Sequence, residues 1–184
     1  MPERSLLRRE LVRGVMALLS IRTYGDPVLR KRAHEVTDID QMIVRLSQNM
    51  IETVRNAGGI GLAATQVGEL PSLFVIDPTP LGMEEKPFVV INPRIVEVAG
   101  ELRREEGCLS IPGLSQELVR PARVVIRGID LDGKEITLEA TSILARAFLH
   151  EIDHLNGVLF IDHLKPGQRE LLRGKLREIA RKKE

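Results

Sequence analysis

The chain has 184 residues, a length that suits one domain, and its 27 Lys and Arg residues nearly balance its 26 Asp and Glu residues. This balance excludes an overall electrostatic field that would steer the chain toward nucleic acid or a membrane, and an aromatic content of 3% without tryptophan disfavours a stacking platform for bases or sugars. The single cysteine excludes an internal disulfide, so its role must be that of a thiol, a thiolate or a metal ligand.

At the N-terminus, residues 1–20 have the apolar spacing of an amphipathic helix. The apolar run Val15–Ile21 follows several arginines, as in a signal peptide, but it is short, Arg22 closes it and no small-residue cleavage site follows. No stretch approaches the roughly 20 apolar residues that a membrane span requires. We therefore expect a cytoplasmic protein.

Further along the chain, periodicity and turn residues predict a mixture of helices and short strands. An Asp-Gly pair at 132–133 is typical of a tight hairpin turn, and Thr141 or Ser142 can cap the helix that follows. The expected elements are helices over 38–57, 141–155 and 166–183, and strands over 73–76, 88–91, 94–99, 124–130 and 135–140. They predict an α+β fold in which antiparallel strands and hairpins pack around a central helix at 141–155, with further N-terminal and C-terminal helices.

The central helix carries the pattern H-E-x-x-H, from His150 to His154. At about 100° per residue the two histidines lie some 40° apart on one face, so their imidazoles can share a metal ion. Glu151 stands beside them, where it can accept a proton from a bound water. More than half of the helix circumference is apolar, so we expect both histidines to point inward.

A catalytic site of this kind needs a third protein ligand and an open position. The extended metzincin motif would place a histidine at position 160, which is Phe160. The remaining candidates are Glu170, Glu178 and His163 downstream, and Cys108 upstream. The cysteine is favoured because it lies among turn residues, whereas the two glutamates lie on a polar, basic helix.

A glycine-rich segment, Gly59–Gln66, fits the form G-x-G-x-x-A. A dinucleotide-binding fingerprint needs a strand before the glycines, but here a long helix precedes them. Two interpretations remain. The segment is either a tight packing turn of small residues, or a backbone edge that approaches a ligand, with the amide of Gln66 turned toward it.

Together these segments resemble the peptide deformylase family. Three family motifs occur without a mismatch and in the family's order: G-x-G-L-A-A-x-Q at Gly59–Gln66, E-G-C-L-S at Glu106–Ser110 and H-E-x-D-H at His150–His154. The resemblance covers about Leu18 to Arg181 and is greatest to bacterial members with a helical C-terminus. It implies a single catalytic domain over 16–184, preceded by an N-terminal extension over 1–15.

The resemblance implies a hydrolase that removes the formyl group from the N-terminal formylmethionine of newly made polypeptides and releases formate. It implies one divalent metal, usually Fe(II), although Zn(II), Ni(II) or Co(II) can occupy the same ligands: Cys108, His150 and His154. Water would take the open position, and Glu151 would accept its proton. The Gln66 side-chain amide and the Leu109 backbone N–H would hold the oxyanion.

In this family the substrate backbone lies beside an extended segment, here near Ile60, Gly61 and Gly107. The helical wheel places Ile143 and Ala147 on the metal side of the central helix, so we expect them to line an apolar pocket for the methionine side chain. The sequence departs from the family at Arg104 and Arg146, which flank regions that are often apolar near the substrate groove.

The C-terminal segment is basic, with eight Lys or Arg and three Glu over 165–184. An apolar side is expected from Leu171, Leu172, Leu176 and Ile179, and an outward basic side from Arg173, Arg177, Arg181, Lys182 and Lys183. The resemblance implies that this helix binds the ribosome near the exit tunnel, weakly and in a salt-dependent manner. Two alternatives remain: a peptidase that uses Glu170 or Glu178 as third ligand, and a catalytically inactive ribosome-binding module, which intact Glu151 and Gln66 disfavour.

Overall fold

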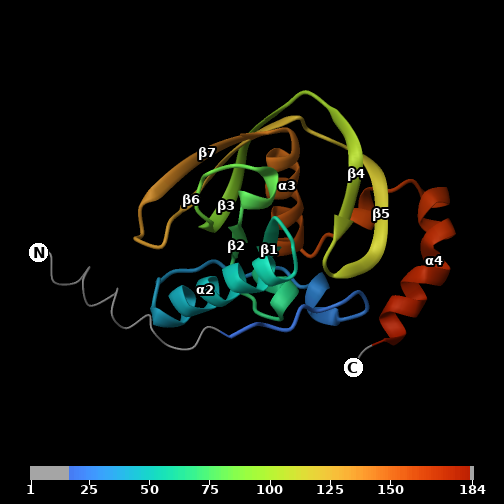
Figure 1. Ribbon diagram of the computed structural model, residues 1–184, viewed down its shortest axis with the longest axis horizontal. Coiled ribbons are helices and arrows are strands. Elements are labelled where there is room, and N and C mark those ends of the chain that lie inside the picture. Colours follow the sequence, from blue (N-terminus) through green and yellow to red (C-terminus); the bar gives the residue numbers. More distant parts are fainter. Residues whose placement is uncertain (1–16, 183–184) are drawn as a thin grey trace, which may run out of the picture.

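The computed structural model describes residues 17–182, so the predicted extension over 1–15 and the basic residue Lys183 lie outside the described residues. Three α-helices and seven strands form the described part of the chain, together with four short 3-10 helices (Figure 1). The helices are α2 (Gln41–Asn56), α3 (Ser142–Leu155) and α4 (Pro166–Arg181). The strands are β1 (Gly61–Ala63), β2 (Leu73–Ile76), β3 (Phe88–Ala99), β4 (Leu102–Cys108), β5 (Ile111–Arg120), β6 (Arg123–Ile129) and β7 (Glu135–Thr141). No helix within this range is long and apolar enough to cross a membrane.

The strands form two antiparallel units. Five of them make a sheet in the order β1-β2-β3-β6-β7, and β4 and β5 make a separate hairpin. The predicted turn at 132–133 is confirmed, since β6 pairs with β7 from Ile129–Glu135 to Arg123–Thr141. The α+β prediction is therefore confirmed, with α3 between the large sheet and the β4–β5 hairpin (Figure 1).

The two faces of the large sheet are covered by different helices. On one face Phe74 and Ile126 pack against Phe148 of α3. On the other face Leu62 and Val75 pack against Met50 of α2. Because neighbouring residues of a strand point to opposite faces, the fully buried strand β2 contributes to both layers. This packing places the inward face of α3 beside the edge strand β1.

The break predicted between strands at 88–91 and 94–99 is wrong, because β3 runs continuously from Phe88 to Ala99. The register with β6 shifts between Ile91 and Arg94, which accommodates Pro93 and its missing N–H in a bulge. Asn92 adopts a positive φ of 50°, and its side chain bonds both the N–H and the C=O of Val36. These contacts hold the irregularity in place.

Two details of the helices also differ from expectation. Thr141 occupies the N-cap of α3 without a side-chain hydrogen bond, and Ser142 follows at a φ of 53°, so neither caps the helix as predicted. On α4, Leu176 and Ile179 are buried and Leu172 is partly buried, but Leu171 is 87% exposed. Leu171 lies one position off the i, i+4, i+7 stripe that docks the helix.

Candidate active site

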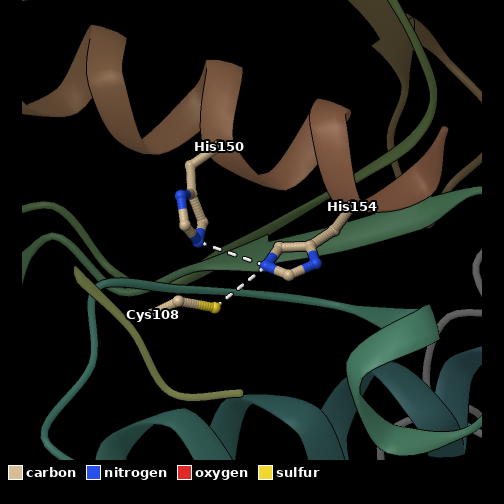
Figure 2. A group of neighbouring side chains, drawn as sticks. All are labelled: Cys108, His150 and His154. Atoms are coloured by element: carbon tan, nitrogen blue, oxygen red, sulfur yellow. Dashed lines mark hydrogen bonds between the residues drawn. The ribbon is translucent and has the colours of Figure 1, made fainter. Parts of the chain in front are cut away.

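Three candidate metal ligands meet where the end of β4 approaches α3 (Figure 2). The Sγ atom of Cys108 lies 3.1 Å from Nε2 of His154, which lies 3.2 Å from Nε2 of His150. One ligand atom from each residue lies within 4.8 Å of the other two, and this is the single group of its kind over residues 17–182. The structure thus brings together the three ligands expected from the sequence.

The alternative third ligands lie elsewhere. Glu170 and Glu178 are exposed on α4, where they pair with Arg173 and Lys182. The imidazole of His163 is 39% exposed and bonds the carboxylate of Asp153 at 2.7 Å. None of them belongs to the group formed by the cysteine and the two histidines.

The local structure explains the convergence of these ligands. One helical turn separates the two histidines, and their rings lie 4.8 Å apart in a T-shaped arrangement. Cys108 is the last residue of β4, just before the tight connection to β5, where it pairs with Ile111. The centre therefore joins two elements that are distant in the sequence, a helix and a hairpin end.

Behind His150 lies a carboxylate whose role the sequence reasoning missed. Glu106 accepts hydrogen bonds from His150 Nδ1 at 2.7 Å, from Arg120 Nε at 3.1 Å and Nη2 at 2.7 Å, and from Arg146 Nη1 at 2.7 Å. Burial alone would raise the pKa of Glu106, but hydrogen bonds from His150 and Arg120 hold it well below its usual range. No pattern in its own segment identifies this role, because its donors come from β5 and α3.

These donors fit a divalent transition metal. With its Nδ1–H donated to Glu106, His150 presents the lone pair of Nε2 toward Cys108 and His154. A thiolate with two imidazoles suits Zn(II), Fe(II), Co(II) and Ni(II). The chemistry of the ligand set and its orienting carboxylate therefore agree with a metal centre.

Glu151 lies beside this centre and is nearly completely buried. Its Oε2 atom has no hydrogen-bond partner among the described residues, and burial raises the pKa of the carboxyl to about 7. A Cβ atom at Gly61 would lie 2.5 Å from Oε1 of Glu151, so only glycine lets β1 approach this side chain so closely. The carboxyl group is thus held against β1.

The residues on either side of β1 support both interpretations of the glycine-rich motif, as a packing turn and as a backbone edge near a ligand. Gly59 is a packing position, because a Cβ atom there would lie 2.9 Å from Leu109 Cδ1. Gln66 turns its amide toward the metal ligands: Oε1 accepts from the N–H of Ala63 at 2.9 Å, and Nε2 lies 3.6 Å from Cys108 Sγ and 3.2 Å from Ser110 Oγ. Accepting from Ala63 fixes which end of the amide faces the centre.

A groove of about 640 Å³ opens onto these side chains. It is lined by all five residues that the sequence proposed for substrate binding, namely Ile60, Gly61, Gly107, Ile143 and Ala147, and by Gln66, Cys108, Leu109, His150 and Glu151. β1 is an edge strand of the large sheet and β4 belongs to a two-stranded unit, so both offer backbone groups to an extended ligand. Arg146 lines the groove from a buried position, whereas Arg104 is not among the lining residues.

Known proteins resemble this chain over nearly its whole length. Residues 18–170 match the family model described as polypeptide deformylase. The peptide deformylase of Thermodesulfovibrio yellowstonii is 50% identical over 162 residues, which are 88% of this chain and 98% of that relative. Crystal structures of peptide deformylases from Legionella pneumophila and Thermus thermophilus are each 39% identical with a TM-score of 0.83, and the matches cover 90% of this chain and 96% and 99% of theirs. The chain therefore belongs to the polypeptide deformylase family.

Proposed function

We propose that this chain uses the groove between β1 and β4 to remove the formyl group from the N-terminal formylmethionine of new polypeptides, releasing formate. The observation that carries the proposal is the convergence of three metal ligands, a buried carboxyl and an oriented amide in one groove. Membership of the family makes the enzyme metal-dependent.

In this proposal Cys108, His150 and His154 hold one divalent metal, and in the cell that metal is Fe(II). When bound, the metal supplies Lewis-acid chemistry, making a water molecule more acidic and polarising the formyl carbonyl. Glu106 fixes the ring of His150 for this purpose. Zn(II), Ni(II) and Co(II) fit the same donors and serve as replacements in experiments.

Glu151 moves the proton in our mechanism. Its carboxylate takes a proton from the attacking water as the water oxygen bonds to the formyl carbon. When the bond between the formyl carbon and the peptide nitrogen breaks, Glu151 returns that proton to the nitrogen. The second proton of the water stays on its oxygen, so the immediate products are formic acid and a peptide with a free amino terminus, and the formic acid then loses its proton to solvent and leaves as formate.

The negative charge that develops on the formyl oxygen needs donors in the groove. We assign this role to Nε2 of Gln66 and the backbone N–H of Leu109. The hydrogen bond from the N–H of Ala63 to Oε1 of Gln66 supports the assignment, because it turns Nε2 of the same amide group toward Cys108. Donors fixed before the reaction stabilise the transition state without reorganising during it.

The peptide backbone would lie between Ile60 and Gly61 on one side and Gly107 on the other, as an added strand. The methionine side chain would enter the apolar part of the groove at Ile143 and Ala147, which lie on the metal side of α3. A formyl group is the smallest acyl group, so a closely packed centre favours it over acetyl.

The decisive experiment is an anaerobic assay of formate release from a formyl-methionyl peptide, with the acetyl-methionyl peptide as control. We expect hydrolysis of the formyl-methionyl peptide alone, and the absence of hydrolysis would leave only a binding module.

Metal analysis of Cys108→Ala tests the peptidase alternative. We expect this variant to lose its metal, whereas an enzyme with Glu170 or Glu178 as third ligand would keep it.

We further propose that the enzyme works in the cytoplasm and binds the ribosome through α4. The supporting observation is the split between buried Leu176 and Ile179 and the exposed side chains of Arg177 and Arg181. Exposed cations on a docked helix can make nonspecific contacts with phosphates of ribosomal RNA.

A further inference from the structure

Arg146 is a buried arginine one turn before His150 on α3, with a side chain that is 7% exposed. Its Nη1 atom donates to Glu106 Oε2 at 2.7 Å. Its Nη2 atom donates to the carbonyl oxygens of Leu102 at 2.8 Å and Leu118 at 3.1 Å. Burying a guanidinium group is costly unless it is paired and hydrogen-bonded, so these contacts constrain the structure around them.

The hydrogen bonds of Arg146 connect α3 with the β4–β5 hairpin, the two parts of the fold that supply the metal ligands. Two ligands, His150 and His154, come from α3, and the third, Cys108, comes from β4. Arg146 belongs to the helix, but its three acceptors belong to the hairpin strands β4 and β5. It therefore ties the hairpin that carries the thiol to the helix that carries the imidazoles.

The contact with Glu106 also completes the surroundings of the carboxylate that orients His150. Oε1 accepts from His150 and Arg120, and Oε2 accepts from Arg120 and Arg146, so each oxygen has two donors. Two lone pairs on each oxygen are then occupied. Without Arg146, Oε2 keeps one donor and the carboxylate gains freedom to rotate away from the imidazole.

We infer that Arg146 is a positioning residue of the metal centre, acting through Glu106 on His150 and through the hairpin carbonyls on Cys108. This inference rests on the proposed metal site. It gives the arginine in the groove wall a function beyond contact with substrate.

The test compares Co(II) affinity, by competition with a chelator, and the Co(II) absorption spectrum in the wild type and Arg146→Met. We expect the dissociation constant to rise by about 10–100-fold, the usual effect of losing a group that supports a metal ligand. We also expect the thiolate-to-Co(II) charge-transfer band and the d–d bands to change, because both depend on how the ligands surround the metal. Arg146→Lys should recover part of the affinity, because an ammonium group can reach Glu106 but cannot reproduce the guanidinium fork.

Arg123→Met is the control, since Arg123 likewise joins separate elements through its guanidinium group, here by pairing with Glu97 of β3 and Glu139 of β7, away from the metal centre. We expect it to leave Co(II) affinity and spectrum unchanged. In a Glu106→Gln background, Arg146→Met should have a smaller effect than in the wild type, because the two residues act together.

Failure of the wild type to bind Co(II) would overturn the proposed metal site itself. If the wild type binds, an Arg146→Met protein with unchanged affinity and spectrum overturns the present inference. A rise in KM with unchanged Co(II) affinity also overturns it, because Arg146 would then act only as a groove wall. Should Arg146→Met fail to fold, an Arg146→Lys protein identical to the wild type in affinity and spectrum has the same consequence.

Discussion

At the residue scale, a substitution at Glu151 can test proton transfer separately from metal binding, because Glu151 lies beside the three candidate metal ligands without being one of them. We expect Glu151→Gln to retain its metal, since Glu151 is not among the three converging ligands, but to lose about 10²–10⁴-fold in kcat/KM. Metal content and formate release measure the two effects. Glu117→Gln, an exposed change on β5, serves as the control. A Glu151→Gln enzyme with more than about a tenth of wild-type activity would contradict the role of general base.

A site residue could be predicted from the sequence where the residues it acts with are its neighbours along the chain. The histidine pair and Glu151 could be predicted, because one helical turn determines their relation. The environment of Glu106 could not, since its donors Arg120 and Arg146 come from β5 and α3. A charged residue that is buried only by distant partners has no signature in its own segment of sequence.

At the scale of elements, the strained start of α3 allows a stability prediction. Ser142 has a φ of 53°, a conformation that costs an L-residue about 1–2 kcal/mol. Glycine removes that cost but adds freedom to the unfolded chain, so we expect Ser142→Gly to raise the free energy of unfolding by about 0.5–1 kcal/mol. Urea unfolding measures the change, and a loss of stability would show that the Ser142 side chain has a stabilising contact.

Asn92→Gly provides the contrast at a similar φ of 50°. Here the side-chain amide bonds the backbone of Val36 at 2.8 and 2.9 Å. Removing both hydrogen bonds should outweigh the relief of strain, so we expect a net loss of about 1–2 kcal/mol. Opposite signs at the two positions would separate backbone strain from side-chain bonding.

The hairpin that carries Cys108 shows why some elements could not be predicted. In β4 the charged residues Arg103, Arg104 and Glu105 are exposed, and the one buried residue is Glu106. Strand prediction relies on alternating apolar residues, and this strand has only Leu102 and Cys108, one at each end. By contrast, β2, β6 and α3 bury apolar residues against each other, and the spacing of these residues along the sequence predicted the three elements.

At the scale of the whole molecule, the position of residue 17 bears on the predicted N-terminal extension. The N–H of Ala17 donates to Asn49 Oδ1 at 3.1 Å, and the N–H of Leu19 donates to Thr53 Oγ1 at 2.9 Å, both on α2. A chain that begins at Met16 keeps these contacts, so we expect it to fold and deformylate as the full chain does. Thermal unfolding and formate release check this, and a substantial loss in either would show that residues 1–15 contribute to the domain.

The basic surface of α4 leads to a prediction about the enzyme's partner. Exposed cations that contact RNA phosphates release counterions, so binding should weaken steeply between about 50 and 200 mM salt. We expect the combined reversal of Arg177, Arg181, Lys182 and Lys183 to Glu to reduce cosedimentation with ribosomes. Hydrolysis of a short formyl-methionyl peptide should be unaffected, because Arg177, Arg181 and Lys182 are not among the residues that line the groove.

A matched variant controls for net charge. It reverses four other exposed cations distributed over the rest of the surface, namely Arg45, Lys86, Arg127 and Lys134. If attraction depends on the arrangement of charge along α4, this variant should still cosediment more strongly than the helix variant does. Equal loss in both variants would mean that overall charge alone determines the attraction, and binding that survives reversal on α4 would leave the helix with the single role of packing Leu176 and Ile179 against the domain.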